Sequence, residues 1–152
     1  MKLFLSTYIN KIDKKGRVSV PASFRQALKD EEFSGIIVFK SHKNKALEGW
    51  SSSRIEQISD SIDNFDVFSE EQDYLTTSIF SESQQLGFDI DGRITLPAEM
   101  IKQLELDEKI AFVGLGKTFQ IWNPKDLEEH KAKSLAKLKE NKTTLKINKE
   151  EK

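Results

Sequence analysis

The sequence predicts an α+β protein built from two copies of one strand–turn–strand–helix unit. The first observation is an ungapped repeat: Ile12–Ala22 reads IDKKGRVSVPA and Phe88–Ala98 reads FDIDGRITLPA, at a constant offset of 76 residues. The second is that apolar and polar residues alternate after each turn up to a proline, which predicts a strand followed by a helix. The third is size. A unit of about 45 residues buries too little apolar surface to fold alone, so the two copies should share one core.

Each repeat opens with an Asp-x-x-Gly-Arg turn. Asp13 and Asp89 can accept hydrogen bonds from the backbone ahead of them, and Gly16 and Gly92 can adopt a positive φ. We therefore expect these four residues, with Arg93, to be structural parts of the turns. In the strands that follow, the core-facing positions should be Val18, Val20, Ile94 and Leu96. The outward-facing positions should be Arg17, Ser19, Arg93 and Thr95.

The remaining elements follow from periodicity and capping signals. Short helices are predicted over 21–29, with Phe24 and Leu28 inward, and over 97–104, with Met100, Ile101 and Leu104 inward. Further strands are predicted at 5–12, 35–39, 45–48, 83–88, 109–113 and 118–122. Longer helices are predicted over 52–64, over 70–80 after Ser69, and from Asn123-Pro124 onward. Beyond about Lys139 we expect a frayed tail.

Four segments are expected along the chain. Residues 7–54 form the first repeat, 55–81 an acidic helical connector, 82–125 the second repeat, and 126–152 a C-terminal helix with a basic tail. Residues 2–29 hold seven Lys or Arg and one acid, whereas residues 48–73 hold one Arg and eight acids. The net charge of −1 therefore hides a basic region that suits a polyanion and an acidic region set apart from it.

Several functional classes have no support in the sequence. The chain has no cysteine and two histidines, His42 and His130, both expected to be exposed, so no metal or other cofactor is predicted. Gly114–Thr118 resembles the end of a phosphate-binding loop, but the required first glycine is Ala111 and a strand follows, so nucleotide binding is not expected. No constellation supports an enzyme. No apolar run is long enough to span a membrane, and a cytoplasmic protein is expected.

The doubled Asp-x-x-Gly-Arg-(Val/Ile)-x-(Val/Leu)-Pro-Ala motif resembles the AbrB/SpoVT superfamily of DNA-binding proteins. Two copies in one chain of this length are similar specifically to the MraZ family of bacterial transcriptional regulators. The resemblance covers about residues 1–130 and includes the start Phe4–Tyr8 and the run Phe119–Pro124. It implies tandem, pseudo-symmetric swapped-hairpin β-barrel units with flanking helices. It also implies a nucleoid-associated homo-oligomer, ring-like in form, that binds direct repeats in the promoter of the division and cell-wall gene cluster.

The candidate contacts to double-stranded DNA lie in the first repeat. The resemblance makes Arg17 a DNA contact, and its fork of donors suits guanine edges. Basic residues near it would neutralise phosphates: Lys11, Lys14, Lys15 and Arg25. The second turn carries Asp89 and Asp91 and no lysine, so we expect it to serve structure, with Arg93 paired to a carboxylate. The alternative for Arg17 is the same intramolecular ion pair.

A second hypothesis is an antitoxin-like protein-interaction module that uses the same barrel and sequesters a partner with its tail. The basic tail is consistent with it, but the two motif copies favour the DNA-binding regulator.

Overall fold

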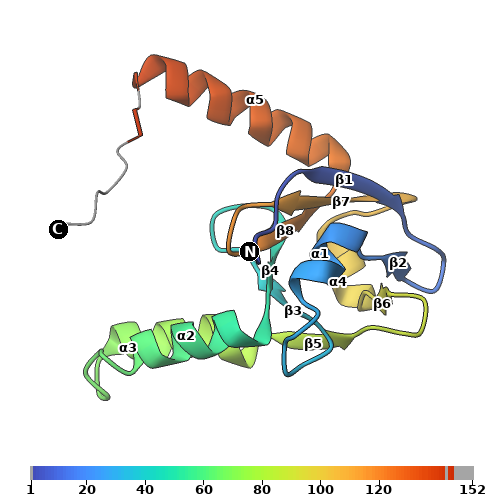
Figure 1. Ribbon diagram of the computed structural model, residues 1–152. Coiled ribbons are helices and arrows are strands. Elements are labelled where there is room, and N and C mark those ends of the chain that lie inside the picture. Colours follow the sequence, from blue (N-terminus) through green and yellow to red (C-terminus); the bar gives the residue numbers. More distant parts are fainter. Residues whose placement is uncertain (1, 143, 146–152) are drawn as a thin grey trace, which may run out of the picture.

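Figure 1 shows the computed structural model, which describes residues 2–142, 144 and 145. Its strands are β1 (Thr7–Lys11), β2 (Arg17–Ser19), β3 (Gly35–Lys40), β4 (Ala46–Trp50), β5 (Gln84–Gly87), β6 (Arg93–Thr95), β7 (Lys109–Gly114) and β8 (Phe119–Trp122). Its helices are α1 (Ala22–Ala27), α2 (Ser52–Ile62), α3 (Glu70–Leu75), the π-helix η1 (Thr76–Ser81), α4 (Ala98–Gln103) and α5 (Pro124–Glu140). The expected α+β class and the order of its elements are confirmed.

Strands of both repeats share each of the two sheets. The larger sheet has the order β1-β7-β8-β4-β3-β5, and all its pairs are antiparallel. Strand β1 of the first repeat thus lies beside β7 of the second, and β5 of the second lies beside β3 of the first. Strands β2 and β6 form a separate antiparallel ribbon. Because β1 and β5 are sheet edges, the described strands form an open sheet and a ribbon, and the implied closed barrel is not seen.

Local capping explains where the helices begin. Pro21 and Pro97 stand at the N-caps of α1 and α4 and stop the preceding strands. The side chains of Ser51, Ser69 and Asn123 accept backbone hydrogen bonds at the starts of α2, α3 and α5. These starts match the expected ones.

The helix expected over 70–80 changes type halfway, from α3 to η1. The Thr76 hydroxyl donates to the carbonyl oxygens of Gln72 (2.9 Å) and Asp73 (3.0 Å). The Ser81 hydroxyl likewise donates to the Thr77 carbonyl. Such side-chain donors compete with the backbone N–H groups of a regular α-helix, which accounts for the wider turn.

One core lies between the sheet, the ribbon and the short helices. Phe24 is fully buried at its centre, with ring centroids 5.2 Å from Phe4, 5.1 Å from Phe119 and 6.3 Å from Phe112. The predicted inward positions Val18, Val20, Leu28, Ile94, Leu96, Met100 and Leu104 are all buried in this cluster. Ile101 packs against it while staying partly exposed.

The long helices project on the opposite side from α1 and α4 (Figure 1). At the start of α5, Leu127 is buried against Ala46, Ala111 and Trp122, whereas Leu135 and Leu138 are more than half exposed. His130, expected to be exposed, stacks on the Trp122 ring at a centroid distance of 4.7 Å, because α5 crosses the sheet there. None of the described helices is long and apolar enough to cross a bilayer.

Candidate nucleic-acid interface

The first turn is held together by the Asp13 carboxylate. One oxygen accepts hydrogen bonds from the backbone N–H groups of Lys15 and Arg17, both at 2.9 Å, and the other accepts from the Arg17 Nε at 2.7 Å. Gly16 has a φ of +84°, and a Cβ there would lie 2.7 Å from the Leu96 carbonyl oxygen. The turn therefore requires glycine for its backbone angle and for its packing.

The second turn repeats this arrangement. Asp89 accepts from the backbone N–H groups of Asp91 and Arg93 and from the Arg93 Nε, all at 2.9 Å. One contact has no counterpart in the first turn: the Arg93 Nη2 donates to Asp91 at 3.4 Å. The residue equivalent to Asp91 in the first turn is Lys15. The Arg17 side chain thus forms the intramolecular ion pair stated as its alternative, with Asp13 at 2.7 Å. Among the described residues this side chain is bonded only through Nε, so its terminal nitrogens are not bound to a turn carboxylate as in the second copy.

The β2–β6 ribbon places the two turns around a local two-fold axis. Val18 lies opposite Ile94 at the centre of the ribbon, and Arg17 and Arg93 lie opposite Thr95 and Ser19. Both arginines are on the outward face, half-buried, and both line one shallow cavity of about 370 Å³ beside Lys11 and Ser19. The fold thus presents Arg17 and Arg93 together on one exposed surface.

The helix contacts cross between the repeats, which the sequence did not indicate. A Cβ at Gly92 would lie 2.7 Å from the Arg25 Nη1, and at the equivalent Gly16 it would lie 3.2 Å from the Ile101 Cδ1. Arg25 therefore covers the second turn, while Ile101 covers the first. Arg25 also donates from Nε to the Val20 carbonyl at 3.1 Å. Its charge offsets part of the acidity of the second turn, and its role toward DNA stays a prediction.

Register brings a further lysine to the first turn. Lys11, the last residue of β1, lies opposite Lys109, the first residue of β7, and both are exposed. The equivalent positions in the other half of the sheet are Gly35 and Gly87. Lys109 was missed from sequence because no local pattern shows that strands about 100 residues apart would pair.

The surface around the first turn is more basic than that around the second. Lys14 and Lys15 are exposed at its tip, with Lys11 and Lys109 at its base. Like charges opposite each other on paired strands destabilise a sheet. A strand pair that keeps two exposed lysines face to face therefore suits a surface that meets an anionic partner.

Both turn carboxyls should make folding stability depend on pH. The backbone N–H of Arg17 lowers the pKa of Asp13 below its ordinary 3.8 more than partial desolvation raises it, and the Arg17 and Lys15 hydrogen bonds act in the same direction. The backbone N–H of Arg93 lowers the pKa of Asp89 in the same way. Both groups therefore stabilise the fold above their unfolded pKa, and that stability is lost as the pH falls through the folded values.

We expect the double variant Asp13→Asn/Asp89→Asn to flatten the acid limb of the stability curve, below about pH 5. Urea unfolding monitored over a pH series measures this. Asp60→Asn is the matched control, since Asp60 is exposed on α2 outside both turns. An acid limb as steep in the double variant as in the parent would contradict the role assigned to the two carboxylates.

Comparison with known proteins also divides the chain into two repeats. The family described as "MraZ protein, putative antitoxin-like" matches the chain twice, over residues 3–77 and 79–148. "Transcriptional regulator MraZ" of Pelagibacter ubique is 48% identical over 144 residues, covering 95% of this chain and 93% of its own. The proteins of the same name from Rickettsia akari and Rickettsia bellii are 45% and 42% identical, over 86% and 95% of this chain and 87% and 97% of theirs. The chain therefore belongs to the MraZ family.

Proposed function

We propose that this chain is a sequence-specific DNA-binding transcriptional regulator whose first turn contacts the DNA. The observation that carries the proposal is the exposed ribbon face, where Arg17 stands among Lys11, Lys14 and Lys15. The name of the relatives, "Transcriptional regulator MraZ", supports it.

The lysines and Arg17 are proposed to make different contacts with DNA at this surface. Exposed lysine ammonium groups neutralise phosphates, which gives affinity that falls with salt and carries no sequence information. Arg17 is suited to base recognition, because a guanidinium can donate two parallel hydrogen bonds to the major-groove edge of guanine. Asp13 binds the Arg17 Nε at 2.7 Å and so fixes the direction of the fork before DNA arrives. This orientation reduces the entropy lost on binding.

The first copy is proposed as the principal reader and the second as scaffold. Asp91 occupies one terminal nitrogen of Arg93, whereas Lys15 stands at the equivalent place beside Arg17. An acidic side chain repels phosphate and a lysine attracts it. Arg25 lies against the second turn, so it is proposed to contact phosphate from that side of the ribbon.

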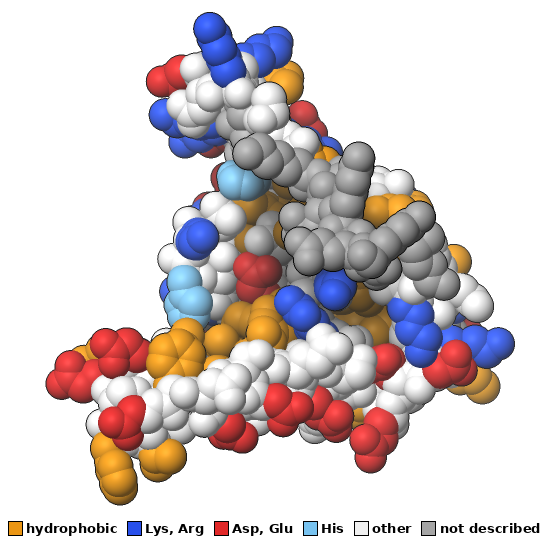
Figure 2. Space-filling model, turned by 60° about the vertical axis from the view of Figure 1, so that its left-hand side comes forward, with side chains coloured by type: hydrophobic (Ala, Val, Ile, Leu, Met, Phe, Trp, Pro, Cys, Tyr) orange, Lys and Arg blue, Asp and Glu red, His pale blue; other side chains and the backbone are white. Residues whose placement is uncertain are grey.

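One turn contacts too few bases to select a promoter, so specificity is proposed to come from assembly. A ring-like homo-oligomer that presents the turn several times onto direct repeats multiplies weak contacts through effective concentration. Figure 2 shows a charge separation that suits head-to-tail contacts: acidic side chains gather along α2 and α3, and basic ones on α5. A cytoplasmic, nucleoid-associated regulator of the division and cell-wall cluster is the corresponding cellular role.

Selection of bound sequences from random DNA, together with the mass of the assembly in solution, tests the proposal. We expect enrichment of a short element repeated at regular spacing and a mass several times that of the chain. Affinity for the enriched DNA should fall steeply as salt rises. Recovery of unenriched random DNA would contradict sequence-specific regulation, and a monomer mass would contradict the assembly.

The antitoxin-like function is the second candidate. The family description names it, and α5 offers Leu135 and Leu138 as exposed apolar contacts among lysines. Deleting residues 141–152, and in a second variant replacing Leu135 and Leu138 with serine, separates the two functions. Loss of partner binding with DNA binding retained would favour the interaction module.

A further inference from the structure

A cationic pocket lies at the far end of β1 from the first turn. Its volume is about 170 Å³, several times the roughly 30 Å³ that one water occupies. Four separate segments line it: the N-terminal segment before β1 with Lys2 and Phe4, the loop between α1 and β3 with Glu31, the start of α2 with Arg54, and the β7–β8 turn with Lys117. None of the described residues that line this pocket also lines the cavity beside Arg17 and Arg93, so the pocket is distinct from the proposed DNA surface.

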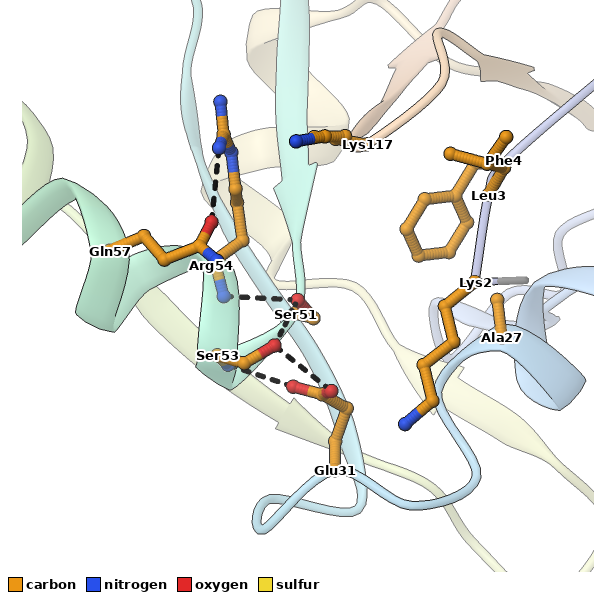
Figure 3. Close-up of a pocket in the computed structure, with 10 residues that line it drawn as sticks. All are labelled: Lys2, Leu3, Phe4, Ala27, Glu31, Ser51, Ser53, Arg54, Gln57 and Lys117. Carbon is orange, nitrogen blue, oxygen red and sulfur yellow. Dashed lines mark hydrogen bonds between the residues drawn. The ribbon is translucent and has the colours of Figure 1, made fainter. Parts of the chain in front are cut away.

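The single carboxylate in the pocket is already engaged. Glu31 accepts hydrogen bonds from the Ser53 N–H (2.7 Å), the Ser53 hydroxyl (3.0 Å) and the Ser52 hydroxyl (3.2 Å) at the start of α2. Partial desolvation raises the pKa of Glu31. Together, these hydrogen bonds and the nearby Lys2 lower it by more, so the net pKa is below its ordinary value. Glu31 thus stays ionised as a cap, and Figure 3 shows the Lys2 ammonium turned toward it.

Arg54 and Lys117 have no counterion among residues 2–142, 144 and 145. Neither makes a salt bridge within the described part of the chain, in which Lys2 pairs with Asp30 at 3.8 Å. Figure 3 shows the Lys117 ammonium directed toward the side of the pocket where the Arg54 guanidinium stands. Two positive charges that share a cavity repel each other, and an anion bound between them would offset that repulsion.

Arg54 is also held in place from behind. Its Nη1 donates to Gln57 at 3.1 Å, and its guanidinium carbon lies 5.8 Å from the centre of the Trp50 ring. In the described residues, the buried side-chain nitrogens or oxygens that lack a hydrogen-bond partner are Arg54 Nε and Trp50 Nε1, both donors at this one place. Buried donors without acceptors are costly. Arg54 lines the pocket and Trp50 packs against its guanidinium, so an acceptor in the pocket would satisfy the Arg54 Nε.

We propose that this pocket binds the phosphate group of a small phosphorylated metabolite, held by Arg54 and Lys117. A guanidinium fork and an ammonium point charge are the two donors that proteins combine for phosphate. The volume leaves room for a few further atoms beside the phosphate. The pocket joins residues of both repeats, so ligand binding there would stabilise the whole fold and give the regulator a place for a metabolic signal.

Calorimetric titration of the full chain with inorganic phosphate and with glycerol 3-phosphate, at fixed ionic strength, tests the site. We expect saturable binding of both, weakened roughly tenfold by Arg54→Gln and by Lys117→Gln, since each removes a charge-assisted hydrogen bond. Lys117 is exposed on a turn, so its substitution leaves the fold intact. Lys43→Gln, an exposed lysine outside the pocket, is the matched control and should bind as the parent does.

The Trp50 indole N–H gives an independent readout by nitrogen-15 NMR. Its resonance should move on binding, whereas that of Trp122, already bonded to Gln120 at 2.9 Å, should stay. Absence of saturable binding, or equal weakening by Lys43→Gln, would overturn the proposal. If Arg54→Gln and Lys117→Gln lowered DNA affinity or assembly mass while free phosphates did not bind, the pocket would be a DNA or protein contact instead. Because DNA binding through Arg17 is measured separately, either proposal can fail alone.

Discussion

Arg17→Ala is expected to weaken binding to the selected DNA by about 5- to 150-fold, the effect of losing one bidentate base contact worth roughly 1–3 kcal/mol. The loss should also relax sequence preference, because the remaining lysines contact phosphates only. Filter binding at fixed salt, with the selected site and a scrambled site, measures both effects. Repeated in an oligomer, the loss would multiply across the copies.

Arg93→Ala is the matched control, since Arg93 occupies the equivalent place in the second turn and forms the same bond to its aspartate at 2.9 Å. We expect it to reduce DNA affinity far less than Arg17→Ala. Its terminal nitrogen already pairs with Asp91, and the residues equivalent to Lys14 and Lys15 are Ile90 and Asp91. Abolished binding in Arg93→Ala with intact binding in Arg17→Ala would refute the assigned asymmetry. Equal losses would mean that the ribbon acts as one symmetric surface.

Phe24→Ala is expected to lower the free energy of unfolding by about 3–5 kcal/mol, the usual loss for emptying a buried phenylalanine site. Phe24 is fully buried and packs edge-on against Phe4, Tyr8 and Phe112 and at a tilt against Phe119. The cavity would therefore have walls from both repeats and could not easily collapse. Urea unfolding monitored by circular dichroism gives the change directly. A domain of this size is stable by about 5–15 kcal/mol, so much of the margin would be lost.

The same substitution at Phe68 is the control, because it removes the same side chain from an exposed position. Phe68 is 95% exposed between α2 and α3, so Phe68→Ala should change the free energy of unfolding of the isolated chain by less than about 0.5 kcal/mol. A large loss there would show that the loop is covered in solution. A small loss in Phe24→Ala would show that the core described here does not limit stability.

Features set by neighbouring residues could be predicted from the sequence. The Asp13 and Asp89 bonds, the positive φ of Gly16 and Gly92, the inward valines and the helix starts all depend on residues within about five positions. The pairing of Arg93 with a carboxylate was predicted for the same reason, and its partners are Asp89 and Asp91. In each case the turn chemistry or the side-chain alternation is encoded locally.

Features set by distant pairing could not be predicted. Lys109 reaches the first turn because β1 pairs with β7, and Arg25 reaches the second because α1 packs across the ribbon. His130 is half-buried because α5 crosses Trp122. Composition showed which residues were basic, but only tertiary contacts decide which of them share a surface.

The exchange of strands between repeats has a consequence for how the chain is made. Strand β1 leaves the ribosome early, yet its partner β7 follows only after about 100 further residues have been added. Until then the edge of β1 that pairs with β7 has no partner strand. In the same way, β3 lacks its partner β5 until residues 84–87 have been made. Neither copy can complete its sheet during its own synthesis. Folding should therefore be a late, single cooperative event dominated by long-range contacts, and a chain interrupted before residue 109 would expose apolar strands to aggregation.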